Sequence, residues 1–394
     1  MPTRYCQSAA GIAAAVLFFC FSLVISQTEA GLSGNPTRGR DHFVRKGCIR
    51  CHGIWGAGQQ IGPDLVKVGM GRSLFEIASS MWNHAPAMSL VMQERSFERP
   101  LFTAVEIQDL LAYLYYLNYF TEPGDPTEGM RIFSEKGCVN CHSVRNVGGQ
   151  GGPQLDTFGR YGTPLYMSQA MWNHGPKMTD EIKRRNVPQP VFEKNEMSHL
   201  LAFIRGKTVG GIPLGGDVLG NPSSGRRLFA EKACDQCHTV DGSGERMGPD
   251  LGVAARELSV TDMAGQMWNH STTMWARMEE LNIPRPVFSA NEMADLIGYI
   301  YFVGFSGGRG DRSRGSAVFR NKGCAGCHSL ENRSESGAPD LSDSPVVASP
   351  FEFLSALWNH SMAMERRMQE RGMDWPLLDE IEMRDLSAYL ASLH

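Results

Sequence analysis

The chain of 394 residues reads Gly47-Cys48-Ile49-Arg50-Cys51-His52 near its N-terminus, and the pattern Cys-x-x-Cys-His returns three more times. The first cysteines of successive motifs lie 90, 96 and 90 residues apart. The motif residues are Cys48, Cys51 and His52; Cys138, Cys141 and His142; Cys234, Cys237 and His238; Cys324, Cys327 and His328. This spacing is the attachment signature of c-type haem, in which both thiols form thioethers to one porphyrin and the histidine becomes the proximal iron ligand.

Other chemistries use parts of the same motif but need a different context. A zinc site would need further ligands of matching type, and a thioredoxin-like pair would need a βαβ unit, which the sequence does not indicate. The two remaining cysteines of the chain, Cys6 and Cys20, lie in the N-terminal apolar segment. We therefore predict four covalently bound haem c groups and no disulfide scaffold.

Four copies of one unit follow from landmarks that keep constant offsets from the first cysteine of each motif. A proline comes 15 residues later, a histidine within Trp-Asn-His 36 residues later, a methionine 40 and a glutamate 58 residues later. The glutamates are Glu106, Glu196, Glu292 and Glu382. We expect domains at residues 31–122, 123–208, 209–306 (which include a linker before the third domain) and 307–394. The Gly/Pro/Ser-rich stretch Gly206–Gly225 is the predicted hinge between two halves.

Residues 1–30 read as a signal peptide. Arg4 precedes an almost wholly apolar run from Ala9 to Ile25, and small residues follow near Ala30. The alternative is an uncleaved membrane anchor over residues 9–25. Both interpretations predict a protein that is periplasmic or otherwise exported, which suits haem attachment outside the cytoplasm. The formal net charge of −4 points to no nucleic-acid partner.

Two helices are expected to cross in each unit. The first carries Gly-x-x-x-Phe and a basic residue two positions before the motif, and the last has apolar residues at helical spacing plus one aromatic residue. A glycine on the first helix would let the last helix cross closely, while the two rings fill the crossing. The glycine, phenylalanine and aromatic residues are Gly39, Phe43 and Tyr113; Gly129, Phe133 and Phe203; Gly225, Phe229 and Tyr299; Gly315, Phe319 and Tyr389.

Together with Gly-Pro-x-Leu and a later methionine, these motifs make each unit resemble a class I cytochrome c domain, and four units cover nearly all of the chain after residue 30. Unit four departs from the pattern with Ala338-Pro339 in place of Gly-Pro. The resemblance implies a small all-α fold wrapped round a haem, with little or no sheet. Such domains bury little protein core, so we expect the apoprotein to be largely unfolded.

The resemblance also implies residues that surround the haem. A proline carbonyl would accept a hydrogen bond from the proximal histidine and so set its tautomer; these prolines are Pro63, Pro153, Pro249 and Pro339. The tryptophans are expected in the haem wall, with the indole N–H on a propionate, or else in simple core packing; they are Trp82, Trp172, Trp268 and Trp358.

Two residue types compete for the distal iron position, because methionine and histidine both bind haem iron. The methionines are Met88, Met178, Met274 and Met364, and the histidines are His84, His174, His270 and His360. The family pattern favours methionine, since relatives often carry an asparagine about five residues earlier, as Asn83 is here. Other methionine positions fail because Ile182 or Leu357 replaces them in one unit. The segment after each methionine reads as continued helix, whereas compact relatives place this methionine on a loop.

Two protein ligands on each iron suit electron transfer rather than catalysis. We therefore expect an electron carrier or relay, not an enzyme, with redox proteins as partners. A haem enzyme acting on peroxide, nitrogen oxides or sulfur compounds is the alternative, but no unit lacks its ligands. A donor subunit of a membrane complex, such as the tetrahaem cytochrome of photosynthetic reaction centres, is a third interpretation; there the methionines precede their motifs.

Overall fold

The computed structural model describes residues 34–54, 56–67, 73–118, 124–156, 163–206, 220–240, 246–331, 337–342, 344–345 and 349–393. The expected signal peptide or anchor, with Cys6 and Cys20, lies outside the described residues, as does most of the expected linker. No helix in the described ranges is long and apolar enough to cross a membrane.

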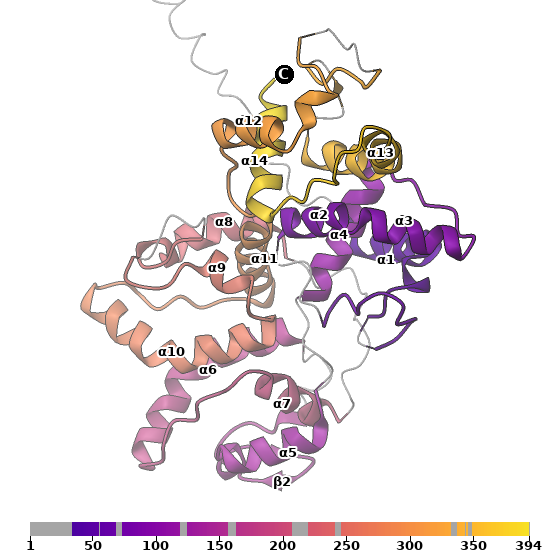
Figure 1. Cartoon of the computed structure of the whole chain (residues 1–394). Coiled ribbons are helices and arrows are strands. Elements are labelled where there is room, and N and C mark those ends of the chain that lie inside the picture. Colours follow the sequence, from indigo (N-terminus) through magenta and orange to yellow (C-terminus); the bar gives the residue numbers. More distant parts are fainter. Residues whose placement is uncertain are drawn as a thin grey trace, which may run out of the picture. The chain divides into compact units, whose positions relative to one another are not determined.

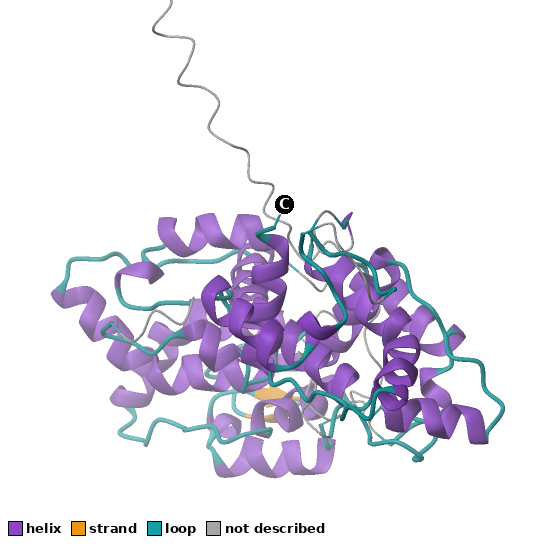
Figure 2. Cartoon of the chain, turned by 45° about the horizontal axis from the view of Figure 1, so that its top comes forward, coloured by secondary structure: helices purple, strands orange, loops and turns teal. Residues whose placement is uncertain are grey.

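The described chain is helical, which confirms the all-α prediction (Figures 1 and 2). Repeat 1 holds α1 (Pro36–Arg45), η1 (Cys48–Arg50), α2 (Leu74–Asn83), α3 (Ala85–Glu94) and α4 (Ala104–Asn118). Repeat 2 holds α5 (Pro126–Glu135), η2 (Cys138–Asn140), a two-stranded antiparallel sheet of β1 (Ser143–Val144) and β2 (Val147–Gly148), α6 (Pro164–Arg184) and α7 (Glu196–Arg205). Repeat 3 holds α8 (Pro222–Glu231), η4 (Cys234–Gln236), α9 (Leu251–Ala255), α10 (Val260–Glu280) and α11 (Ala290–Ser306). Repeat 4 holds α12 (Arg312–Asn321), η5 (Cys324–Gly326), α13 (Pro350–Glu370) and α14 (Glu380–Ala391).

The first helix of every repeat begins at a capping side chain and ends just before the haem motif. In α1 the side chain of Asn35 accepts a hydrogen bond from the backbone of Arg38, and Pro36 follows the cap. The residue before the first cysteine then adopts a left-handed conformation, with φ +81° at Gly47 and +59° at Ala233. Glycine takes this conformation without strain, so the chain turns sharply into the short helix that presents the motif.

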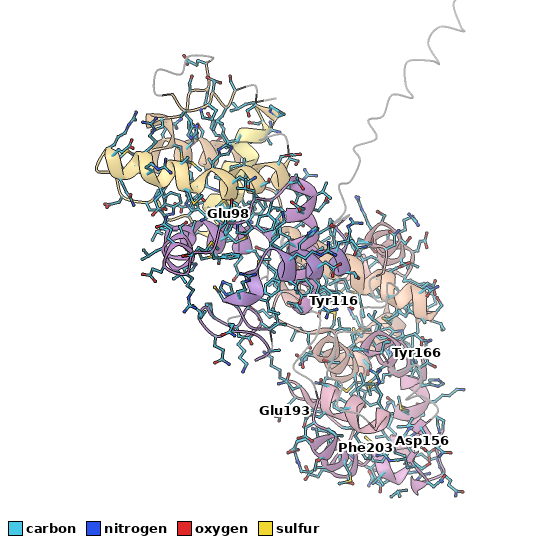
Figure 3. The ribbon with its side chains drawn as sticks, turned by 90° about the vertical axis from the view of Figure 1, so that its right-hand side faces the viewer. Glu98, Tyr116, Asp156, Tyr166, Glu193 and Phe203 are labelled. Carbon is cyan, nitrogen blue, oxygen red and sulfur yellow. The ribbon has the colours of Figure 1, made fainter. Side chains whose placement is uncertain are left out.

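The crossing of the first and last helices is confirmed in all four repeats. A Cβ atom built on Gly39 would lie 1.9 Å from the carbonyl oxygen of Asp109 on α4, and the three equivalent glycines give the same distance. Their first-helix phenylalanines pack on the aromatic residue of the last helix with ring centroids 5.4 to 6.1 Å apart. Figure 3 labels Phe203, the last-helix member in repeat 2. Only glycine permits this close approach of two backbones.

The lysine before each motif ties the first helix to the last. Lys46 Nζ lies 2.7 Å from the carbonyl oxygen of Leu101 and 2.8 Å from a carboxylate oxygen of Glu106. The other repeats form the same pair of contacts, at 2.5 to 2.9 Å and 2.8 to 3.1 Å. The glutamate carboxylate also accepts a backbone N–H at the start of its helix, as from Thr103. The glutamate that recurs in sequence therefore caps a helix and anchors the lysine.

A carboxylate holds the start of the first helix in three repeats. Asp385 accepts hydrogen bonds from the backbone N–H of Asp311 at 2.7 Å and from Arg314 Nε at 2.6 Å. Burial alone would raise the pKa of Asp385, but these hydrogen bonds and the charge of Arg314 lower it below its usual 3.8. Repeat 2 uses an imidazole instead, since Asp125 donates its N–H to His199 Nδ1 at 2.9 Å.

This arrangement predicts an acid-dependent loss of stability that Asp385→Asn abolishes for repeat 4. A carboxyl with a lowered folded pKa stabilises the fold fully above its unfolded pKa, and this contribution disappears as pH falls through the folded value. We therefore expect the protection of the Asp311 amide hydrogen, measured against the exchange rate of an unfolded chain at the same pH, to fall below about pH 4 in the parent chain. In the variant this pH dependence should flatten. Equal pH profiles for both proteins would contradict the assignment.

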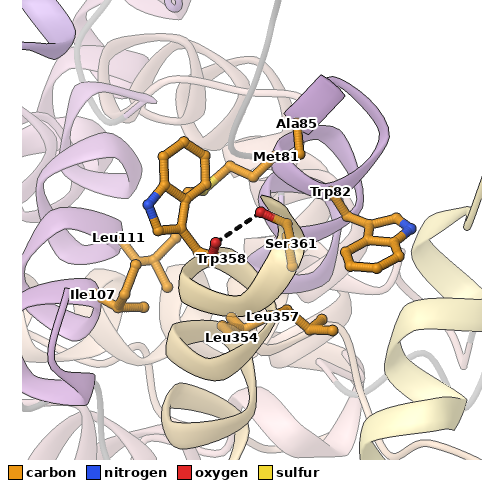
Figure 4. Close-up of a pocket in the computed structure, with 10 residues that line it drawn as sticks. Met81, Trp82, Ala85, Ile107, Leu111, Leu354, Leu357, Trp358 and Ser361 are labelled. Carbon is orange, nitrogen blue, oxygen red and sulfur yellow. Dashed lines mark hydrogen bonds between the residues drawn. The ribbon is translucent and has the colours of Figure 1, made fainter. Parts of the chain in front are cut away.

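The repeats pair across the chain through a contact that we call the clasp. Trp82 donates its indole N–H to the carbonyl oxygen of Pro376 at 2.7 Å, and Trp358 donates to Pro100 in return, also at 2.7 Å. Asn83 both donates to and accepts from the backbone of Leu378, at 2.8 and 2.9 Å. Asn359 does the same with Phe102, at 2.7 and 3.0 Å. Repeats 1 and 4 are thus joined by reciprocal contacts, beside a small apolar pocket (Figure 4).

Repeats 2 and 3 form an equivalent clasp. Trp172 donates to Pro286 and Trp268 donates to Pro190, at 2.8 and 2.7 Å. Asn173 and Asn269 each bond both backbone groups of the opposite residue, Phe288 and Phe192 respectively. The long helices α6 and α10 that carry these side chains pack together.

This pairing overturns the expectation of a hinge between a first and a second half. Repeat 1 is clasped to repeat 4 and repeat 2 to repeat 3, so opening the halves at the linker would break both clasps. Tyr115 of α4 and Phe305 of α11 also pack with ring centroids 4.3 Å apart, which joins the two pairs. Residues 34–393 accordingly belong to one compact unit.

Candidate haem sites

Each haem motif forms one tight turn that places both thiols on one side. The carbonyl oxygen of Cys48 accepts from the backbone N–H of Cys51 at 3.1 Å and of His52 at 2.9 Å. The same pair of bonds recurs in the other three motifs. Side chains three residues apart eclipse one another in such a turn, so the two cysteines face the same porphyrin edge.

The first thiol of each motif lies in an apolar environment. Burial raises the pKa of Cys48, Cys138 and Cys324 to about 11, and that of Cys234 to about 12. Cys48 and Ile49 pack against the core cluster of buried residues that also contacts Met88 and Met92. An apolar wall beside a neutral thiol fits the vinyl edge of a porphyrin.

The proximal histidines show the orientation that the resemblance implies. His52 Nδ1 lies 3.0 Å from the carbonyl oxygen of Pro63, and the other three repeats give 2.9 to 3.0 Å. A carbonyl only accepts hydrogen bonds, so Nδ1 carries the proton and Nε2 keeps its lone pair for a metal. The lone pair of Nε2 is the group through which a histidine would bind iron.

The glycine before each proline makes room for the imidazole ring. A Cβ atom on Gly62, Gly152 or Gly248 would lie 2.4 to 2.6 Å from Cε1 of the proximal histidine. Repeat 4 carries Ala338 at this position and still keeps His328 Nδ1 at 3.0 Å from Pro339. The methyl group must therefore be accommodated by a local shift of ring or backbone, which makes site 4 different from the others.

In repeat 1, Met88 lies on α3 and His84 lies between α2 and α3, whereas in the other repeats both candidate distal ligands lie on one helix, α6, α10 or α13. In repeat 2, Met178 and Ile182 pack against the same cluster as Cys138 and Val139. Met88, Met364, Cys48 and Cys324 all pack against the larger core cluster, and Met274 is half-buried. The helix continues beyond each methionine, to Glu94 in repeat 1 and Glu280 in repeat 3, as expected from the sequence.

The four Trp-Asn-His histidines are exposed. His84 Nδ1 lies 2.8 Å from the carbonyl oxygen of Ser80, and His270 Nδ1 lies 2.9 Å from that of Gln266. Their Nε2 atoms are thereby left with a lone pair, so these histidines remain chemically competent alternatives to the methionines.

Of the two roles expected for the tryptophans, the hydrogen bonds of their indole N–H groups favour packing within the protein over a contact with a haem propionate. The indole N–H of Trp82 is held by Pro376, and each of the other three is held by a proline carbonyl of the paired repeat. The side-chain amide of Asn83 likewise forms its hydrogen bonds with the backbone of Leu378 and not with the methionine five residues later. The Trp-Asn pair thus builds the clasp in every repeat.

Sequence inspection missed the residues that receive the clasp. A proline recurs 52 residues after each first cysteine, followed two residues later by a buried Phe or Leu. These residues are Pro100 and Phe102, Pro190 and Phe192, Pro286 and Phe288, and Pro376 and Leu378. Their constant offset was the available signal, but a backbone acceptor leaves no mark on residue type.

The cysteines, histidines and apolar surroundings of each motif fit a covalently attached haem. No group of three or more His, Cys, Asp or Glu side chains able to hold a metal ion occurs in the described ranges. A haem bound at each motif would supply a one-electron iron couple.

Comparison with known proteins agrees with this chemistry. The family model described as Cytochrome c matches residues 223–301 and 313–394, which lie in repeats 3 and 4. No solved structure matches the chain. The unmatched repeats 1 and 2 share the motif, the Gly-Phe-aromatic crossing and the His–Pro contact with the matched ones.

Proposed function

The chain belongs to the cytochrome c family and carries four covalently bound haem c groups, and on this premise we propose that it is an exported electron relay. It takes electrons from one redox protein and passes them to another. The observation that carries this proposal is the sameness of the four sites: each keeps both cysteines, the oriented histidine and a methionine at the same offset on a later helix.

The protein's own residues have distinct tasks in this proposal. The two cysteines of each motif hold the porphyrin, and the proximal histidine offers Nε2 to the iron while the proline carbonyl fixes its ring. Met88, Met178, Met274 and Met364 are the proposed distal ligands. Their support is half-burial, a constant offset from the motif and the family pattern. The asparagine five residues earlier no longer supports this assignment, because its side chain forms the clasp.

Two further functions are weighed against the relay. A haem enzyme would need one site with an open distal position, and no repeat has lost its methionine or histidine. A membrane-bound donor subunit would require residues 9–25 to remain as an anchor. Proposed export rests on residues 1–30, so mass spectrometry of the mature N-terminus distinguishes a cleaved periplasmic protein from an anchored one.

Near-infrared magnetic circular dichroism of the oxidised holoprotein, with haem content measured alongside, tests the relay and the ligands together. We expect four low-spin haems with histidine–methionine charge-transfer bands. Met88→Ala should remove about a quarter of that intensity, whereas the matched variant His84→Ala should leave it unchanged.

Other spectra would overturn parts of this proposal. Bis-histidine bands that weaken in His84→Ala would assign the distal position to the histidines. A high-spin haem in the parent protein that binds added cyanide or nitric oxide would contradict a pure relay and favour the enzyme.

A further inference from the structure

One buried cation lies in the contact between repeats 1 and 4. Arg99 is 7 % exposed, and the carbon of its guanidinium lies 3.8 Å from the centroid of the Trp358 ring. Nη1 donates to Ser89 Oγ at 2.6 Å and, more weakly, to the carbonyl oxygen of Ala85, while Nη2 reaches that of Trp358 at 3.4 Å. Nε has no hydrogen-bond partner. All these acceptors are neutral.

The charge on Arg99 is therefore poorly neutralised. Burial lowers the pKa of Arg99 to about 10, so the guanidinium stays protonated at neutral pH, and Glu365 is the carboxylate that opposes this shift. No ion pair within 4 Å joins Arg99 to a carboxylate in the described ranges. A charge screened by neither water nor a close counter-ion acts over a longer range than a surface charge.

The position of Arg99 relates it to two haem sites. Ser89, which it contacts, directly follows the proposed ligand Met88 on α3, and Glu365 directly follows the proposed ligand Met364 on α13. Arg99 thus lies between the two segments that supply the distal ligands of repeats 1 and 4.

The other repeats lack this feature at the equivalent position. Repeat 2 has Gln189 there, and repeat 4 has Trp375, which stacks on Trp82 with ring centroids 4.1 Å apart. Repeat 3 has Arg285, but this side chain is exposed and lies 5.3 Å from the ring of Trp275. The chain therefore contains its own matched control: a buried and an exposed arginine at the same position of the repeat.

We propose that Arg99 is a tuning residue that raises the reduction potential of the haem sites in repeats 1 and 4 above those in repeats 2 and 3. This inference rests on the proposed relay. Iron gains one positive charge when it gives up an electron, so a fixed buried cation nearby favours the reduced state. The clasped pair of repeats 1 and 4 would then be the site where electrons collect within the chain.

Spectroelectrochemical titration of the holoprotein tests this proposal, with mediators supplying one electron per iron. Arg99→Gln, which introduces the residue natural to repeat 2, should lower the highest midpoint and change the reduction equilibrium of that site on the order of tenfold. Glu365→Gln should shift it in the opposite direction. Arg99→Lys, which keeps the charge, should retain most of the parent midpoint, and Arg285→Gln should change none of the four.

If Arg99 only stabilises the contact between repeats 1 and 4, its variants should show a different pattern of thermal and reduction midpoints. In that case Arg99→Gln and Arg99→Lys would both lower the thermal midpoint while leaving all four reduction midpoints unchanged, which would overturn the proposal. If Arg99→Gln fails to bind four haems, Glu365→Gln decides, since an unshifted titration there also overturns it. Failure of the relay itself would look different, namely a high-spin, ligand-binding haem in the parent protein.

Discussion

We expect Gly315→Ala to prevent repeat 4 from folding round its haem. An added Cβ atom would lie 1.9 Å from the carbonyl oxygen of Asp385, 2.5 Å from its carbonyl carbon and 2.7 Å from the Cβ atom of Tyr389. None of these contacts can be relieved by turning a flexible side chain, because α12 and α14 meet there backbone to backbone. We expect a loss of about 3 kcal/mol or more in the free energy of unfolding, at the upper end for overpacked sites.

The measurement is haem content by pyridine haemochrome absorbance, together with thermal unfolding followed by circular dichroism. Gly315→Ala should yield three haems per chain instead of four. Ser313→Ala is the matched control on the same helix, because Ser313 is exposed and lies outside the haem motif. Four haems and an unchanged unfolding curve in both variants would refute the close crossing.

The second large effect is expected from the double substitution Asn83→Ala with Asn359→Ala. It removes the asparagine partners of the backbone N–H and C=O groups of Leu378 and Phe102, although the carbonyl of Phe102 still accepts a hydrogen bond from Ser355 Oγ at 2.6 Å. A buried polar group left without a partner costs about 1–3 kcal/mol, so leaving the other three groups unpaired should open the contact between repeats 1 and 4. Haem content should stay at four, because no motif residue changes.

Amide hydrogen exchange at Leu378 and Phe102, together with the radius of gyration from small-angle scattering, measures this opening. We expect faster exchange and a larger radius in the double variant. Asn321→Ala, an exposed position at the end of α12, serves as the control and should match the parent chain. Unchanged exchange at both amides would mean that the clasp contributes little to the pairing.

The clasp also shows why a recurring residue is hard to interpret from spacing alone. Trp82 and Asn83 lie next to His84 and near Met88, so proximity in sequence favoured a role at the haem. Their side chains point to a different repeat, about three hundred residues away along the chain. A helix presents successive residues to different surroundings, so neighbours in sequence need not share a task.

Local rules account for what could be read from residues alone. The turn of Cys48-Cys51-His52, the glycine at each helix crossing and the glutamate at each final helix act within one repeat, where short-range geometry decides. Each pattern could be recognised because it occurs four times. The structure confirms the crossing of the first and last helix of each repeat and the helices themselves. The sequence does not show which repeats pair, because all four carry the same clasp residues and the acceptors are backbone carbonyls. That choice depends on the packing of whole repeats, and it is the packing of repeat 1 on repeat 4 that buries Arg99 while the equivalent Arg285 stays in water.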